Sequence, residues 1–239
     1  MNVLSIGNSF SDDAQTYLHQ LAKKDGVHMH VVNLYIGGCS LRTHYLNMLG
    51  DKESYLLQCN GISTGINVSI RQALESMDWD VITLQQASHF SAKKETYSPY
   101  MEELAAYVRK YCPHTKLYIH ETWAYEEGSE RLKDIAGYDS AREMLSDIKN
   151  AYALAAKSVN ADGIIRCGTA MFEALTLGAE KVHRDTFHAS LGLGRYLLAL
   201  TWYKTLTGND ITYNEFNDFD EAVSNEERQI AIKSVNSIV

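Results

Sequence analysis

Proline and cysteine are scarce in this chain of 239 residues, which contains two prolines and four cysteines. With so little proline, no proline-rich linker divides the chain. We also find no internal repeat, low-complexity tract or block of like charge, and therefore expect a single domain over residues 1–239. The cysteines are Cys39, Cys59, Cys112 and Cys167, and no two of them form a C-x-x-C pair. Their wide spacing favours reduced, mostly buried thiols.

Long apolar runs, positive charge and glycine-rich loops are lacking as well. No stretch of about 18 uninterrupted apolar residues occurs, so we expect no membrane insertion. The formal net charge of -8 would repel a phosphate backbone and argues against a nucleic-acid partner. Only Gly7 follows the first apolar run, whereas the dinucleotide motif G-x-G-x-x-G needs three glycines.

The position of the first apolar run bears on localisation. This run begins at Asn2 and leaves no room for a signal peptide. We therefore expect a cytoplasmic protein, or a secreted one whose signal peptide has been removed. The sequence does not indicate the oligomeric state.

Short apolar runs alternate with amphipathic segments along the chain. The runs that we interpret as core strands comprise residues 2–6, 28–36, 80–84, 116–120 and 163–165. Helical spacing follows each of them, so we predict an α/β fold with a parallel sheet of about five strands covered by helices on both faces. Residues 54–70 interrupt this pattern. They alternate weakly around Asn60-Gly61, which predicts a small β-hairpin insertion.

Ser9 follows the first predicted strand. Apolar residues at spacings of three and four predict one helix after it, and these residues are Ala14, Tyr17, Leu18 and Leu21. Ser9 then lies between a strand's carboxyl end and a helix N-terminus, where open α/β sheets place their chemistry and backbone N–H groups are unpaired. Two interpretations remain open: Ser9 is a nucleophile whose own amide binds an oxyanion, or Ser9, Ser11 or Asp12 merely caps the helix.

Asp185 and His188 lie three residues apart, just before a strongly apolar helix predicted over residues 189–206. In a turn, this spacing lets the carboxylate reach the imidazole Nδ1 and leaves Nε2 free to face a serine hydroxyl. Alternatively, Asp185 or Thr186 caps the helix, and His188 is an ordinary surface residue.

Candidate oxyanion donors follow the second and third predicted strands. Gly37-Gly38 could offer a backbone N–H, and Gln85 or Gln86 a side-chain N–H. The alternatives are a plain turn and a packed or solvated amide. Because these candidates and Ser9 all follow strand ends in one order, the joint pattern is more specific than any one member.

These residues resemble the conserved blocks of the SGNH (GDSL) hydrolases. Gly7-Asn8-Ser9-Phe10-Ser11 is similar to the G-D-S-x-S block, Gly38 to the second-block glycine and Asp185-Thr186-Phe187-His188 to the late D-x-x-H block. The resemblance spans about residues 3–206. It implies a flavodoxin-like three-layer α/β/α fold and ester hydrolysis through an acyl-serine, with Ser9, His188 and Asp185 as the catalytic residues. It implies no cofactor and no metal.

Two blocks depart from the family pattern. Asn8 replaces the first-block aspartate, as happens in related carbohydrate-active branches. The third-block motif G-x-N-D is absent, and Leu84-Gln85-Gln86-Ala87-Ser88 stands there instead. This segment is similar to the Q-G-E block of sialate and xylan acetyl esterases. By that match Gln86, or as second choice Gln85, completes an oxyanion hole with the amides of Ser9 and Gly38.

The third block and the aromatic residues near strand ends suggest a carbohydrate ester as substrate. These aromatic residues are Tyr35, Tyr45, Trp123 and Tyr125. We expect Trp123 to stack on a sugar, although a half-buried Trp at the edge of the core is an equal alternative. An O-acetylated carbohydrate is therefore the first expected substrate, and a short-chain acyl or lipid ester the second.

Three other interpretations remain open. The chain could be a catalytically inactive SGNH-fold module that binds carbohydrate or another partner. It could be a metal-dependent hydrolase that uses His28, His30, His120, Glu121 or His183. Cys39, which follows Gly38 in a turn, could instead serve as a thiol nucleophile, although a small buried hydrophobe is the usual role for such a residue.

Overall fold

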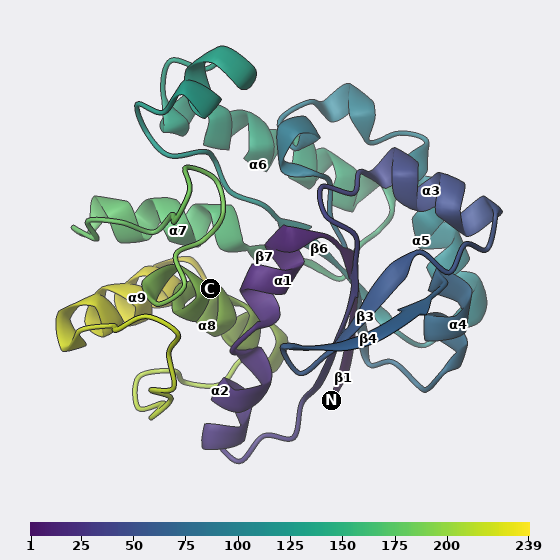
Figure 1. Ribbon diagram of the computed structural model, residues 1–239, viewed down its shortest axis with the longest axis horizontal. Coiled ribbons are helices and arrows are strands. Elements are labelled where there is room, and N and C mark those ends of the chain that lie inside the picture. Colours follow the sequence, from purple (N-terminus) through teal and green to yellow (C-terminus); the bar gives the residue numbers. More distant parts are fainter.

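The computed structural model describes residues 1–239 and has a seven-stranded sheet at its centre (Figure 1). The strands are β1 (Asn2–Gly7), β2 (His30–Tyr35), β3 (Tyr55–Cys59), β4 (Ile62–Val68), β5 (Val81–Leu84), β6 (Lys116–Glu121) and β7 (Gly163–Arg166). Their order across the sheet is β4-β3-β2-β1-β5-β6-β7. Strands β1, β2, β5, β6 and β7 are parallel. The antiparallel pair β3 and β4 extends one edge. The predicted five-stranded parallel sheet and hairpin insertion are therefore confirmed.

Helices cover both faces of the sheet (Figure 1). They are α1 (Ser9–Gln15), α2 (Leu18–Lys24), α3 (Leu41–Leu49), α4 (Ile70–Glu75), α5 (Tyr100–Tyr111), α6 (Ala141–Ser158), α7 (Cys167–Thr176), α8 (Leu193–Thr207) and α9 (Asn225–Ile238). Short helical turns lie at Ser88–Phe90, Lys94–Thr96 and Arg131–Ile135. The three-layer α/β/α fold expected from the sequence is confirmed.

Each face of the sheet has its own hydrophobic core, because successive strand residues point to opposite faces. Val3 packs with α1, α2 and α7–α9. The next residue, Leu4, packs with α3–α6. The parallel strands are thus buried on both sides, as their continuous apolar runs predict.

The single helix predicted after Ser9 is wrong, because the chain forms α1 and α2 with a break at Thr16-Tyr17. The break lets the Tyr17 hydroxyl donate to the carbonyl of Leu191 and accept the N–H of Asp220 at 2.8 Å. Gly61 of the hairpin packs against the break, and a Cβ there would lie 2.4 Å from the Thr16 carbonyl oxygen. Contacts distant in sequence therefore interrupt a locally continuous helical pattern.

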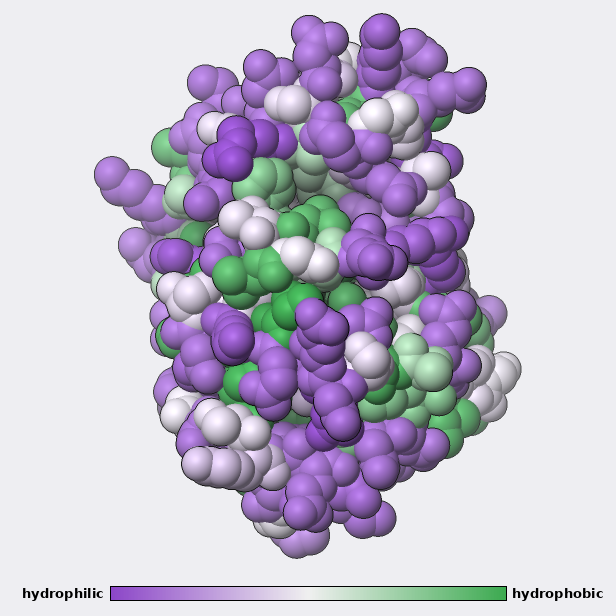
Figure 2. Space-filling model, turned by 90° about the vertical axis from the view of Figure 1, so that its left-hand side faces the viewer, coloured by the Kyte–Doolittle hydropathy of each residue, from purple (hydrophilic) through white to green (hydrophobic).

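The surface is mostly hydrophilic on the side that carries α7 and α9, with apolar side chains gathered in a central band (Figure 2). No helix has the length and apolar character needed to cross a membrane. All four cysteines are free, and three of them are buried while Cys59 is half-buried. The prediction of reduced, mostly buried thiols is confirmed.

Candidate active site

Ser9 is the first residue of α1, and its hydroxyl takes no part in capping the helix. Asn8 is the N-cap: its Oδ1 accepts the N–H of Phe10 at 2.9 Å, and the hydroxyl of Ser11 accepts the N–H of Asn8 at 3.0 Å. The alternative in which Ser9 or Asp12 caps the helix is therefore wrong, and Ser11 takes part only as the partner of Asn8 in a capping box. Asn8 positions the turn and leaves the Ser9 Oγ free for another partner.

That partner is His188, which lies 179 positions further along the chain. Its Nε2 is 2.9 Å from the Ser9 Oγ. Its Nδ1 is 2.8 Å from Asp185 Oδ2, and its backbone N–H donates to Asp185 Oδ1 at 2.8 Å. With the hydrogen on Nδ1, Nε2 is the acceptor for the serine hydroxyl, which is the order of groups in a Ser-His-Asp triad.

Asp185 is held in its charged form by His188. Burial alone would raise the pKa of Asp185, but the hydrogen bonds from the His188 ring and backbone outweigh it and lower the pKa. Asp185 and Thr186 do not cap the following helix, because α8 begins only at Leu193, after Gly192. The alternative in which this pair serves as a helix cap is wrong.

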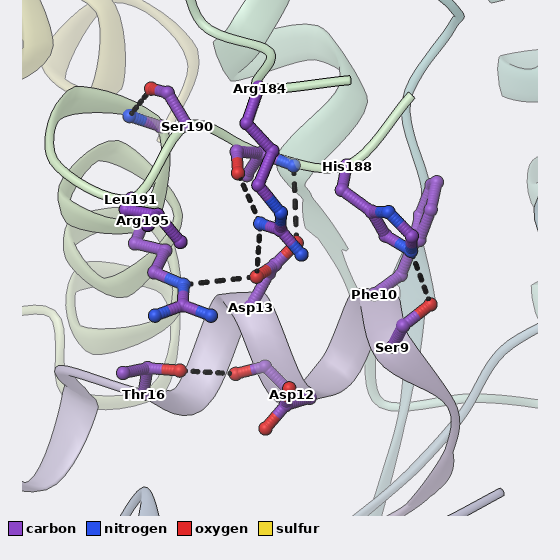
Figure 3. A network of polar contacts seen from close by, with 12 residues as sticks. Ser9, Phe10, Asp12, Asp13, Thr16, Arg184, His188, Ser190, Leu191 and Arg195 are labelled. Carbon is purple, nitrogen blue, oxygen red and sulfur yellow. Dashed lines mark hydrogen bonds and ion pairs between the residues drawn. The ribbon is translucent and has the colours of Figure 1, made fainter. Parts of the chain in front are cut away.

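A buried carboxylate joins the helix of Ser9 to the loop of His188, residues 183–189 (Figure 3). Asp13 lies one turn after Ser9 on α1, and its side chain is 0% exposed. It accepts hydrogen bonds from Arg184 Nη1 at 2.8 and 3.0 Å and from the N–H of Ala189 at 3.1 Å. One carboxylate thus fixes both ends of the loop that carries the imidazole.

A second arginine completes this cluster. Arg195 Nε donates to Asp13 Oδ1 at 3.0 Å, and its Nη1 donates to Asp220 at 2.8 Å. The backbone N–H of Arg184 donates to the carbonyl of His188 at 3.0 Å. We call Asp13, Arg184 and Arg195 the charged flank of Ser9.

The other side of Ser9 is held by neutral groups. The Asn8 Nδ2 donates to the carbonyl of Cys39 at 3.1 Å, which ties the end of β1 to the loop after β2. The Gln85 Nε2 donates to Asn8 Oδ1 at 2.7 Å, and the Gln85 Oε1 lies 2.7 Å from His120 Nδ1. Burial lowers the pKa of His120 to about 3, so this imidazole is uncharged at neutral pH. We call Asn8, Gln85 and His120 the neutral flank.

Two residues of the cleft lining have backbone N–H groups without protein partners. Gly38 has a left-handed backbone (φ +63°), and its N–H makes no hydrogen bond within the protein. The Ser9 N–H is the first of α1 and has no acceptor within the helix. Both residues line the cleft. The structure therefore brings the two predicted backbone donors to the same cavity as the Ser9 hydroxyl.

The prediction that Gln86, or as second choice Gln85, completes an oxyanion hole is wrong. The Gln86 Oε1 accepts the N–H groups of Leu41 and Ala87, both at 2.9 Å, and its Nε2 donates to Thr96. Gln85 is occupied in the neutral flank, and both side chains are buried. Each amide serves as a brace between loops, and neither lines the cleft.

Two polar side chains that follow β5 do line the cleft, those of Ser88 and His89. Ser88 is the one that carries a hydroxyl group. Its Oγ lies 3.1 Å from the Tyr125 hydroxyl. Sequence reasoning missed Ser88 because the third block was matched through its glutamines. Its place two residues after Gln86, in the turn that leaves the strand, is the signal that could have found it.

The expectation that Trp123 stacks on a sugar is also wrong, because this side chain is only 1% exposed. Its ring stacks on Phe10 with centroids 4.0 Å apart, and its Nε1 donates to the carbonyl of Phe187 at 2.7 Å. Tyr125 is equally buried. Trp123 thus supports the Ser9 helix and the His188 loop from below.

The cleft above Ser9 has a volume of about 360 Å³. Its half-buried aromatic lining residues are Tyr35 and Phe187, and its charged lining residues are Asp12, Arg131 and Arg184. A larger hollow of about 680 Å³ lies at the amino ends of β5 and β6, around Asp80 and Lys116. That hollow contains none of the predicted site residues.

The histidines and acidic residues considered as metal ligands do not converge. His28 and His30 line a separate hollow, His120 is buried in the neutral flank, and His183 Nε2 bonds to a backbone carbonyl at 3.1 Å. Glu121 accepts hydrogen bonds from Thr169. No group of three or more His, Cys, Asp or Glu side chains is placed to hold a metal ion, so the geometry gives the metal-dependent alternative no support.

Cys39 is not placed as a nucleophile. Its thiol is buried, with Sγ 3.4 Å from His44 Nδ1. Burial raises the pKa of Cys39 to about 12, which keeps it in the unreactive thiol form.

The chain matches known proteins over nearly its whole length. A family model described as "Domain of unknown function (DUF4886)" matches residues 2–237. No curated protein sequence matches the chain. A solved DUF4886 family protein from Bacteroides uniformis is 33% identical, with a TM-score of 0.91, over 99% of this chain and 93% of that chain.

More distant structures share the fold. A candidate SGNH hydrolase from Slackia heliotrinireducens is 23% identical, with a TM-score of 0.63, over 86% of this chain and 98% of that chain. An acetylxylan esterase from Geobacillus stearothermophilus is 16% identical, with a TM-score of 0.57, over 86% and 94%. The fold of this chain is that of the SGNH hydrolases.

Proposed function

The chain belongs to the DUF4886 family and has the SGNH hydrolase fold, and we propose from its site that it is a serine ester hydrolase. The observation that carries this proposal is the continuous series of hydrogen bonds from Ser9 through His188 to Asp185, with distances of 2.9 and 2.8 Å. In this geometry an imidazole can remove the proton of the serine hydroxyl as that oxygen attacks an acyl carbon.

The reaction then proceeds through an acyl-serine. Ser9 Oγ attacks the ester carbonyl while His188 Nε2 accepts its proton, and Asp185 stabilises the imidazolium. The N–H groups of Ser9 and Gly38 donate to the oxyanion, and the Ser88 hydroxyl lines the same cleft. His188 next protonates the departing alcohol. Water, deprotonated by His188, cleaves the acyl-serine in the same way and regenerates Ser9.

We propose an O-acetylated carbohydrate as the first substrate class and another short-chain ester as the second. A cleft of about 360 Å³ lined by polar and aromatic residues supports a small acyl group and a polar alcohol. The acetylxylan esterase among the structural neighbours supports the carbohydrate part of the proposal. Acetylated xylan and p-nitrophenyl esters of increasing chain length separate the two classes. Faster hydrolysis of acetylated xylan favours the carbohydrate ester, and faster hydrolysis of the short p-nitrophenyl esters favours the second class. A preference for acyl chains of eight or more carbons would contradict both.

The Ser9→Ala variant tests the nucleophile with p-nitrophenyl acetate. We expect kcat to fall by roughly a thousandfold or more, because the remaining donors cannot replace the attacking oxygen. Ser63→Ala is the matched control, since Ser63 is an exposed residue of the hairpin and its hydroxyl makes no hydrogen bond. Undiminished hydrolysis by Ser9→Ala would refute the assignment.

A second candidate function is favoured by one observation. No side-chain amide donates into the cleft, since both glutamines are used as braces. A chain that had lost its turnover would remain a binding module with the same fold. A fluorophosphonate probe distinguishes the two, because it labels an activated serine. Labelling of the wild type but not of Ser9→Ala supports the enzyme, and no labelling of either supports the module.

A further inference from the structure

We propose that the cleft recognises an ester that carries a carboxylate, and that Arg131 binds this carboxylate. This inference rests on the proposed esterase function and names its substrate class more narrowly. It places at the mouth of the cleft a specificity residue that the resemblance to known hydrolases does not supply.

Arg131 begins the short helical turn in the loop between β6 and α6 and lines the same cleft as Ser9 and His188. Its guanidinium carbon lies 3.8 Å above the centroid of the Phe187 ring. The Phe187 and His188 rings are themselves in contact, with centroids 3.8 Å apart. The Phe187 ring therefore lies between the guanidinium and the His188 imidazole and contacts both.

This guanidinium has no ion-pair partner within the protein. Arg131 forms no ion pair, whereas the other arginine of the cleft lining, Arg184, is neutralised by Asp13. The Arg131 side chain also donates no hydrogen bond to the protein. A half-buried guanidinium has five N–H donors, and here all of those donors are free to bind a ligand in the cleft. Stacking on Phe187 fixes its plane and leaves its N–H edge available.

Lys93 is a second positive charge near His89 and Arg131. His89 lines the cleft beside Arg131. Burial lowers the pKa of His89, and the positive charges of Lys93 and Arg131 lower it further, with no carboxylate opposing them. The acidic residue of the lining, Asp12, belongs to α1, where its charged neighbours are Asp13, Arg195 and Arg184. The acidic residues closest to Arg131 in the sequence neither line the cleft nor form an ion pair with it, and they are Glu126, Glu127, Glu130 and Asp134.

A carboxylate is the anion that this arrangement fits. A planar guanidinium donates two parallel hydrogen bonds to the two oxygens of a carboxylate, which a point charge such as a lysine ammonium does not do. The substrate class is then an ester whose acyl or alcohol part bears a carboxylate, such as the acetate ester of an acidic sugar.

Two matched pairs of esters test the proposal in the full chain. The first pair is 4-acetoxybenzoate and its neutral counterpart 4-acetoxybenzamide, which differ in the alcohol part. The second pair is phenyl hydrogen succinate and phenyl succinamate, which differ in the acyl part. Arg131→Met keeps an unbranched apolar side chain beside Phe187 and removes the guanidinium and its charge. Arg142→Met is the control, because Arg142 stacks on Phe172 at 4.9 Å outside the cleft.

For at least one pair, we expect Arg131→Met to lower kcat/KM for the anionic ester by about tenfold or more, mainly through KM. The neutral ester should be hydrolysed as before, Arg131→Lys should recover part of the loss, and Arg142→Met should behave like the wild type. An equal effect of Arg131→Met on both members of both pairs, or no effect, would overturn the inference while leaving the esterase function intact.

A binding measurement separates failure of the inference from failure of the proposed function. If the wild type hydrolyses none of the esters, the proposed function fails. Titration calorimetry with 4-acetamidobenzoate and 4-acetamidobenzamide then tests Arg131 alone. Tighter binding of the carboxylate that is lost in Arg131→Met supports the inference, and equal or undetectable binding of the two compounds contradicts it.

Discussion

The charged and neutral flanks hold Ser9 from two sides by different means. The charged flank buries one carboxylate, Asp13, between two guanidinium groups and joins α1 to a segment about 170 residues away. The neutral flank uses amides and an uncharged imidazole to connect the ends of neighbouring strands. The first fixes the imidazole relative to the hydroxyl, and the second fixes the turn that presents the backbone donors.

The difference predicts unequal consequences when each flank is disturbed. Removing one partner from a buried ion pair leaves an uncompensated charge and costs about 3–5 kcal/mol. Leaving a neutral donor or acceptor unpaired costs about 1–3 kcal/mol. The charged flank should therefore control stability as well as activity, and the neutral flank should act more weakly.

The largest effect is expected for Asp13→Asn, which keeps the shape of the side chain and removes its charge. Arg184 and Arg195 then share a neutral amide, so the free energy of unfolding should fall by about 3 kcal/mol or more. The kcat on p-nitrophenyl acetate should fall too, because the His188 loop is no longer fixed to α1. Urea denaturation and steady-state kinetics measure the two changes.

Asp220→Asn is the control for Asp13→Asn. Asp220 bonds to the same Arg195, but its side chain is 52% exposed. An exposed pair contributes at most about 1 kcal/mol. Similar losses in the two variants would contradict a special role for the buried carboxylate.

An intermediate effect on stability is expected when the pH is lowered, because His120 of the neutral flank is uncharged in the folded protein. Its pKa in the folded protein is about 3, below the ordinary value of 6.5. Between these values the unfolded chain binds a proton that the folded chain does not, so stability is complete above pH 6.5 and decreases as the pH falls. The expected slope from this residue is about 1.4 kcal/mol per pH unit.

Thermal unfolding of the wild type and of His120→Gln between pH 7 and pH 4 measures this contribution. Burial lowers the pKa of His44 as well. As the pH falls, the wild type should therefore lose more stability than His120 alone accounts for. His120→Gln should show a shallower slope than the wild type. Identical slopes would mean that His120 is not shielded from protonation in the folded protein.

The smallest effect is expected for Gln85→Leu, which removes the amide between Asn8 and His120. We expect a loss of about 1–3 kcal/mol in the free energy of unfolding and a moderate fall in kcat with KM nearly unchanged, because the Asn8 turn would hold the oxyanion donors less firmly. Stability curves and kinetics measure both. A loss as large as that of Asp13→Asn would remove the distinction between the flanks.

The sequence predicted the fold and the meeting of Ser9, Asp185 and His188, because those features follow from local patterns. Strand runs and turns place Ser9 at a strand end, and the D-x-x-H spacing places a carboxylate on the imidazole. The parallel sheet then brings strand ends to one edge. Each step needs few residues and little knowledge of distant contacts.

The errors concern side chains whose roles depend on distant partners. Gln86 and Gln85 stand at the expected strand end, but both side-chain amides are used in hydrogen bonds within the protein. Gln86 bonds to Leu41 and Thr96, and Gln85 bonds to His120. Trp123 lies near a strand end yet is covered by Phe10. Asp13 and Arg131 escaped notice because neither belongs to a recognisable spacing. Only the packed structure shows which polar groups remain free.

The asparagine that interrupts the G-D-S signature has a consequence for redesign. Its amide nitrogen supplies a hydrogen to the Cys39 carbonyl, while its oxygen receives one from Gln85. An aspartate would confront that carbonyl with a second acceptor and set up a repulsion. Restoring the common signature by a single exchange would thus loosen the loop carrying Gly38, and positions 8 and 85 should vary together among homologues.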